Sequence, residues 1–135
     1  GFGVPENLGA SINTKENETD ACISPDGDYL VFTSTRDGGF GNGDLYISFR
    51  TDDGGWTRAV NLGETVNTEH LEFCPSVSRD GKYLFFTSNR PKAEAIAGTS
   101  AIREELGVTP SSGRPDIDIY WIDAGFIESF RPAVG

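Results

Sequence analysis

Apolar and β-branched residues gather in two short runs, Tyr29–Ser34 and Tyr83–Ser88, where they partly alternate with polar residues. This pattern favours strands that pack on both sides. Each run follows an Asp-Gly pair, Asp26-Gly27 or Asp80-Gly81, which tolerates the positive φ angles of tight hairpin turns. The sequence therefore predicts two antiparallel hairpins.

Further strands are expected after each hairpin. Asp44–Phe49 and residues 117–122 have the composition of a third strand. After the turn signal at residues 52–55, residues 56–62 predict a fourth strand. The tail at residues 125–132 fits either a closing strand or a short helix, and its periodicity does not decide between them.

The chain contains an internal repeat. An offset of 54 residues places residues 7–36 on residues 61–90 without a gap, and 15 of these 30 positions are identical. The match continues beyond an insertion, because residues 43–47 resemble residues 117–121. Four antiparallel strands in a repeat of this length are typical of a propeller blade.

The first repeat resembles a known family. Ser24-Pro25-Asp26-Gly27, followed by the Tyr29–Ser34 run and then Asp44-Leu45-Tyr46, is similar to the WD40-like repeat called PD40 in TolB-like β-propellers. In the second repeat Arg79 stands where the family has Pro, a change confined to a turn. The resemblance implies an all-β fold with two four-stranded blades, at residues 18–62 and 72–131, and an outer strand at residues 1–8 that belongs to a preceding or exchanged blade.

The residues ahead of the second hairpin resemble a particular group of these repeats. Asn61-Leu62-Gly63, Asn67-Thr68 and Glu72 are similar to repeats of bacterial cell-envelope proteins. The resemblance therefore implies a periplasmic or envelope-associated protein. It does not imply one function, because the repeat serves both in partner-binding proteins and as the non-catalytic propeller of larger enzymes.

Two blades are too few for a closed propeller, which needs about four to eight. The 135-residue chain is therefore expected to be a piece of a longer protein or a subunit that closes its ring by assembly, and the absence of Met favours a chain without its natural start. Three copies of two blades would make a six-bladed ring. In that arrangement residues 2–8 would supply the outer strand of a neighbour's second blade.

The second repeat carries an insertion at residues 91–115, where the first has only residues 37–42. Residues 101–106 are good helix formers that end at Gly107, so a short helix is expected there. The insertion fits a recognition loop and a partly disordered loop equally well.

The charge balance is acidic, with 11 basic and 21 acidic residues and a net charge of −10. Nucleic acids and anionic membranes are bound through clusters of Lys and Arg, so the sequence predicts neither as the main partner. No apolar run is long enough for a membrane span, and no signal-peptide pattern is present. Cys22 and Cys74 occupy different levels of the repeat, which favours two buried thiols over a disulfide.

Candidate chemistry is sparse. The chain has one His, no nucleophile elbow and no His or Cys pair at metal-ligand spacing, so neither a metal nor a cofactor is predicted. Glu18, Asp20, His70 and Glu72 fall near the start of the two inner strands, at one mouth of the expected channel, where propellers usually bind ligands. They are candidates for binding cations, basic side chains or sugar hydroxyls, or else they satisfy loop backbone amides.

An Arg and an Asp recur at the same places in both repeats. Arg36 and Asp44 match Arg90 and Asp118, each Arg ending a second strand and each Asp beginning a third. Because neighbouring strand ends lie close together, the sequence predicts an Arg36–Asp44 and an Arg90–Asp118 ion pair of structural type.

Two classes of function fit these observations. The first is a non-catalytic propeller segment that binds a protein, a peptide or a cell-wall glycan. The second is the propeller part of an enzyme, either a polysaccharide lyase or hydrolase or a serine peptidase whose catalytic domain lies elsewhere.

Overall fold

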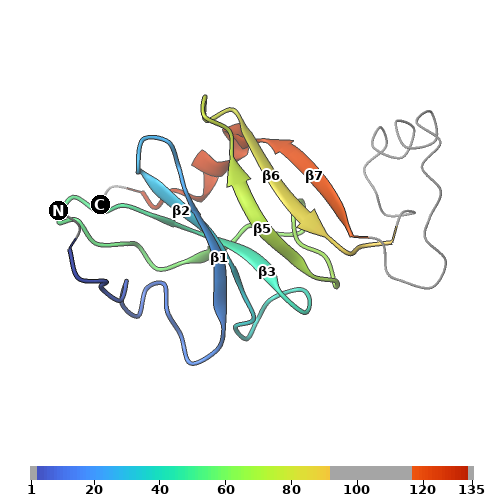
Figure 1. Ribbon diagram of the computed structural model, residues 1–135, viewed down its shortest axis with the longest axis horizontal. Coiled ribbons are helices and arrows are strands. Elements are labelled where there is room, and N and C mark those ends of the chain that lie inside the picture. The colour runs from blue at the N-terminus through green and yellow to red at the C-terminus, as the bar shows by residue number, and fades with distance from the viewer. Residues whose placement is uncertain (1–2, 92–116, 134–135) are drawn as a thin grey trace.

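The computed structural model describes residues 3–91 and 117–133, which form two antiparallel β-sheets and one short 3₁₀-helix (Figure 1). The first sheet has the order β1-β2-β3-β4 and the second the order β5-β6-β7. The strands of the first sheet are β1 (Glu18–Ile23), β2 (Tyr29–Ser34), β3 (Asp44–Phe49) and β4 (Val60–Asn61). Those of the second are β5 (Glu72–Val77), β6 (Tyr83–Ser88) and β7 (Asp118–Asp123), and the 3₁₀-helix η2 (Ala124–Phe130) follows.

Both predicted hairpins form, and the same hydrogen bonds hold their turns. The Ser24 hydroxyl accepts from the amide of Tyr29 at 3.1 Å, and the Ser78 hydroxyl accepts from the amide of Tyr83 at 3.0 Å. Gly27 and Gly81 adopt φ of 76° and 72°, a region that a side chain disfavours. The repeated Ser and Gly positions therefore fix two equivalent turns.

The second sheet packs against one face of the first, and the main core lies between them (Figure 1). The face of the first sheet that takes part comprises Tyr29, Val31, Leu45, Ile47 and Phe49. Leu84, Phe86 and Tyr120 face it from the second sheet. A smaller cluster of Ile12, Leu30, Phe32 and Tyr46 covers the other face of the first sheet. Strand β2 is therefore buried on both sides, as its composition predicts.

A bulge interrupts the inner strand of each sheet at the same repeat position. The register with the partner strand shifts between Thr19 and Cys22 in β1, and between Phe73 and Ser76 in β5. Asp20 and its repeat equivalent Cys74 adopt φ of 52° and 49° at these bulges. Non-glycine residues rarely adopt such angles, so each bulge stores local backbone strain.

The structure departs from the predicted blades in two places. The fourth strand of the first sheet is only two residues long. The second sheet has three strands in the described residues, because the chain turns directly from β7 into η2. The Asp123 side chain accepts from the amide of Gly125 at 2.7 Å, and the amide of Ala124 donates to the carbonyl of Lys82 at 2.8 Å, which starts the helical turn.

Two further expectations concern the ends of the repeats. Residues 3–8 form no strand in this structure, although an outer strand was expected at residues 1–8. The short helix expected within the insertion at residues 91–115 lies outside the described residues. None of the helices in the described residues is long and apolar enough to cross a membrane.

Substitution of Ile47 tests the core between the sheets. Ile47 is fully buried, and its register partner on β4, Val60, is 41% exposed. We expect Ile47→Ala to lower the free energy of unfolding by about 2–5 kcal/mol, because the cavity lies where the two sheets meet. Val60→Ala, the control on the adjoining strand, should cost under about 1 kcal/mol. Urea unfolding followed by tryptophan fluorescence measures both, and equal losses would contradict this account of the core.

Candidate functional site

The two repeats carry the same polar cluster at the start of their inner strands. In the second repeat the Arg90 guanidinium lies 3.2 Å from the Glu72 carboxylate, and it donates to the carbonyl of Val66 at 2.5 Å. Glu72 also accepts from Thr68 and Ser88. Its side chain is completely buried, so this charge depends on its partners.

The first repeat reproduces these contacts around Glu18. The Arg36 guanidinium lies 3.3 Å from the Glu18 carboxylate and donates to the carbonyl of Ile12. Burial alone would raise the pKa of Glu18. Hydrogen bonds from Thr14 and Ser34 and the charge of Arg36 outweigh burial and hold the pKa below its ordinary value of 4.5. Glu18 therefore stays ionised down to acidic pH.

Glu18 and Glu72 thus have a different role from the one expected. Both carboxylates hold an Arg and the amide of a loop residue, Thr14 or Thr68, so they anchor the loops that lead into β1 and β5. This corrects the expectation that they present charge to a ligand at a channel mouth. The alternative, that they satisfy loop backbone amides, is the one that the structure supports.

The predicted ion pair Arg36–Asp44 is wrong. Arg36 pairs with Glu18, and Asp44 instead accepts from the amides of Phe40 and Gly41 and from the Asn61 side chain. The Asp44 carboxylate is therefore occupied by the amides of the Gly-rich loop and does not pair with Arg36. Arg90 makes the equivalent contact with Glu72, and its pairing with Asp118 stays a prediction.

Asp20 and His70 have other surroundings, although the His70 amide donates to the Thr68 hydroxyl beside Glu72. His70 is half-buried, with its Nε2 atom 3.6 Å from the Glu69 carboxylate, and its backbone carbonyl accepts from the amide of Asn42. Asp20 is exposed on the bulge of β1, and its negative charge acts on the thiol of Cys74 on β5. In the contacts of the described residues, Glu18 and Glu72 thus hold loops, whereas Asp20 lies on a bulge and His70 on the loop before β5.

Both cysteines are free, and they contribute to the contact between β1 and β5. The Cys22 sulfur accepts from the amide of Val77 at 3.3 Å, which joins the two inner strands. The expectation of buried thiols is wrong for Cys74, which is exposed. Its desolvation, the charge of Asp20 and the hydrogen bond with Asp20 raise the pKa of the Cys74 thiol above its ordinary value.

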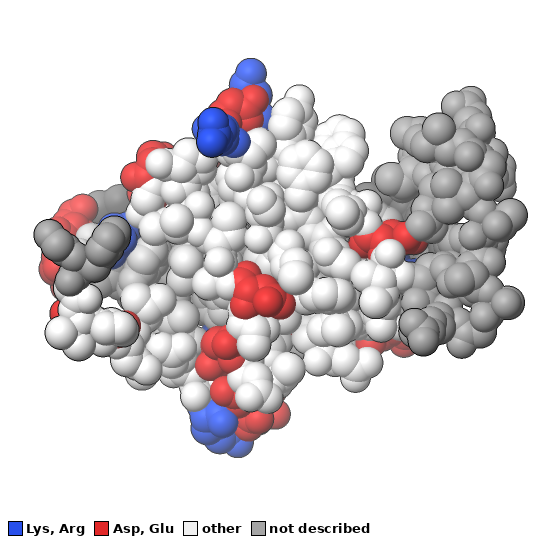
Figure 2. Space-filling view, in the orientation of Figure 1, with Lys and Arg blue, Asp and Glu red and all other residues white. Residues whose placement is uncertain are grey.

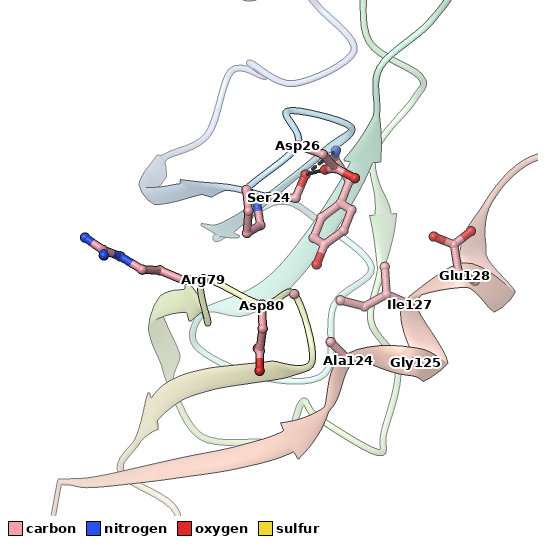
Figure 3. A pocket seen from close by; sticks show the side chains of 11 residues that line it. Ser24, Asp26, Arg79, Asp80, Ala124, Gly125, Ile127 and Glu128 are labelled. Atoms are coloured by element: carbon pink, nitrogen blue, oxygen red, sulfur yellow. Dashed lines mark hydrogen bonds between the residues drawn. The ribbon is translucent and has the colours of Figure 1, made fainter.

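A groove of about 410 Å³ lies between the two hairpin turns and η2 (Figure 3). It is lined by Ser24 and Asp26 of the first turn, by Asp80 of the second, and by Ala124, Ile127 and Glu128 of η2. The Tyr29 side chain forms part of the lining, and Arg79 points away from the other side chains in Figure 3. Sequence analysis missed this groove because η2 was not distinguished from a strand.

The groove is negatively charged. Hydrogen bonds from Ser24 and from the amide of Asp28 lower the pKa of Asp26, and those from Ser78 and Lys82 lower the pKa of Asp80. Burial, followed by nearby negative charges, raises the pKa of Tyr29. At neutral pH the groove therefore presents ionised carboxylates beside a protonated phenol, which suits a cationic or multiply hydroxylated ligand.

Arg131 closes the end of η2. Its guanidinium binds Glu128 at 2.8 Å, contacts Asp28 and stacks 4.3 Å from the ring centre of Phe49. The hydrogen bonds to Glu128 and Asp28 raise the pKa of Arg131. Arg131 thus fastens the helix that carries one wall of the groove to the first sheet.

The face of the molecule that Figure 2 shows carries few charged side chains. Figure 2 shows a face over β1, β5 and β6 that is largely uncharged, with a few acidic side chains near its middle. Within residues 3–91 and 117–133, no group of three or more His, Cys, Asp or Glu side chains is arranged to hold a metal ion.

Comparison with known proteins gives one partial similarity. No family model matches the chain. A segment of 55 residues, 41% of the chain, is 34% identical to alkaline phosphatase PafA from Elizabethkingia meningoseptica. The chain covers 10% of the length of that phosphatase. The similarity concerns a small part of the enzyme and does not place this chain in its family.

Neutralising Glu72 tests the buried cluster. We expect Glu72→Gln to destabilise the fold by about 3–5 kcal/mol, since it removes the buried carboxylate that accepts from Arg90, Thr68 and Ser88. Glu18→Gln removes the same charge at the repeat equivalent, where Arg36 and Glu18 retain 15% and 9% side-chain exposure, and it should cost less. Urea denaturation at neutral pH compares them. A larger loss in Glu18→Gln would show that burial does not govern these pairs.

The thiol of Cys74 provides a second test. Its raised pKa lowers the thiolate fraction at pH 8, so Cys74 should react with iodoacetamide more slowly than free cysteine does. Asp20→Asn removes the neighbouring charge and should speed the reaction. Both proteins carry Cys22→Ser so that mass spectrometry follows one thiol. An unchanged rate in Asp20→Asn would exclude Asp20 as the cause.

Proposed function

We propose that this chain is a segment of a TolB-like β-propeller in the bacterial envelope that acts as a non-catalytic binding module for a protein, peptide or cell-wall glycan. The groove between the equivalent hairpin turns carries this proposal. Asp26, Asp80 and Glu128 give it negative charge, and Tyr29 adds a phenol. Its lining in the described residues lacks the paired nucleophile and base of a covalent hydrolase.

The repeat and the packing of the sheets support the propeller. Both hairpins share their turn contacts, their bulges and their Arg–Glu clusters, as consecutive blades would. The Arg–Glu clusters hold the loops before β1 and β5 in place, and the groove lies at the opposite ends of these strands. We favour a ligand that presents a primary amine, since the groove and the net charge of −10 are both negative.

Binding of a labelled tri-lysine peptide tests the groove. We expect fluorescence anisotropy at low salt to show binding of tri-lysine but not of tri-glutamate. Asp80→Asn should weaken tri-lysine binding by about two- to fivefold, as expected for one exposed charge contact. A soluble muropeptide is the probe for the glycan alternative.

Asp53→Asn is the matched control. Asp53 sits in another exposed turn, where its carboxylate accepts from Thr51 and Gly55 much as Asp80 accepts from Ser78 and Lys82. If the two variants weaken tri-lysine binding equally, the peptide responds only to the net charge of the protein, and the proposal that it binds at the groove is wrong. Cleavage of a soluble cell-wall polysaccharide by the purified chain would favour the enzyme alternative instead.

A further inference from the structure

The second sheet has an apolar outer face that the described residues leave exposed. We call it the open face; Tyr83 and Phe85 on β6 and Ile119 and Trp121 on β7 form it, with exposed fractions between 38 and 72%. Phe85 lies opposite Trp121 in the strand register, and the rings of Tyr83 and Trp121 meet edge to face at 5.4 Å. A contiguous apolar patch of this kind marks an interaction surface.

The repeat shows what covers such a face. The equivalents of the four open-face residues in the first sheet are Tyr29, Val31, Leu45 and Ile47, which are at most 8% exposed. They are buried because the second sheet packs on them. The surface that fits the open face is therefore the surface that the second sheet itself presents to the first.

The chain presents that surface a second time, at its other end. In the second repeat Leu62 is 1% exposed and Val77 packs into the core between the sheets. Their equivalents in the first repeat, Leu8 and Ile23, are 43% and 49% exposed. We call Leu8 and Ile23 the matching surface; within residues 3–91 and 117–133 they lack the neighbour that Leu62 and Val77 have.

The loop behind the matching surface already has its docked conformation. The amide of Asn13 donates to the carbonyl of Gly9 at 2.8 Å, and its equivalent, Asn67, donates to that of Gly63 at 2.8 Å. The Asn67 side chain then binds both backbone groups of Leu45, at 2.8 and 3.0 Å. This contact links the loop before β5 to β3 of the first sheet.

Equivalence places the same link between two molecules. Ile119 on β7 occupies the position of Leu45, and Asn13 occupies that of Asn67. Within one chain, the loop before β1 and strand β7 lie at opposite ends of the molecule (Figure 1). One copy therefore cannot join its own matching surface to its own open face.

We propose that copies of this chain associate head to tail, with the open face of one copy packed on the matching surface of the next. The Asn13 side chain then binds the backbone of Ile119 in the neighbouring copy, and residues 6–7 extend along β7 as β4 extends along β3. Contacts of this heterologous kind generate a ring when the rotation closes. Rings of about four to eight blades correspond to two to four copies.

Light scattering on a size-exclusion column tests the association with the intact chain. We expect a discrete species of two to four copies, with three copies at about 44 kDa, three times the 14.6 kDa of one chain. The mass should persist over about a tenfold dilution if the ring is closed, because each copy then makes two contacts. A species of 14.6 kDa at every concentration would overturn the proposal and leave the open face to another protein.

Two charge substitutions identify the surfaces. Ile119→Asp alters the open face and Leu8→Asp the matching surface; both positions are exposed, so circular dichroism should show an unchanged fold. Each variant alone should be monomeric, whereas an equimolar mixture should form a dimer through its one intact contact. Phe40→Asp, on an exposed loop outside both surfaces, should assemble like the parent chain.

The mixture also distinguishes other modes of contact. If open faces pair with each other, Ile119→Asp will be monomeric and Leu8→Asp will still associate, which would overturn the head-to-tail arrangement. Asn13→Ala should weaken association without adding charge. The tri-lysine assay is read on the monomeric variants too, so a loss of assembly and a failure of the groove give different results.

Discussion

Each sheet of this chain can bury only one of its faces by itself, and the structure depends on the next sheet to cover the other. Strand β2 shows the completed state: Val31 faces the second sheet, Phe32 faces the cluster around Ile12, and both are buried. Strand β6 shows the incomplete one, since Leu84 is buried while Phe85 is exposed. The same sequence pattern therefore gives a core strand or a surface strand according to its neighbour.

The Arg–Glu clusters determine where such packing leaves room for function. Arg36 and Arg90 each bind a carboxylate and a loop carbonyl, and each lies over two aromatic rings of its own sheet. A buried ion pair with these extra partners tolerates little movement. The ends of β1 and β5 near Glu18 and Glu72 are therefore rigid supports, and the groove at the other ends is the better place for a ligand.

The repeat made much of this fold predictable. Strands β1–β3 and β5–β7 and both Asp-Gly turns were expected, because periodicity and turn chemistry act locally. The partner of Arg36 was not predicted. Glu18 and Asp44 both lie opposite Ser34 at the strand ends, so the strands alone do not choose between them. The choice depends on the Gly-rich loop, whose amides donate to Asp44. The groove escaped prediction because it depends on η2, where Asp123 and Gly125 favour a turn over a fourth strand. The propeller ring and the bound partner stay proposals.

The two proposed interactions differ in their physical origin. Binding at the groove depends on opposite charges at an exposed surface, so added salt weakens it. Head-to-tail packing buries apolar side chains between copies that each carry a net charge of −10, so salt screens their repulsion and strengthens the contact. No residue of the open face or of the matching surface is among those that line the groove, so the two interactions use different side chains. A chain with both properties would bind its ligand and its neighbour at the same time.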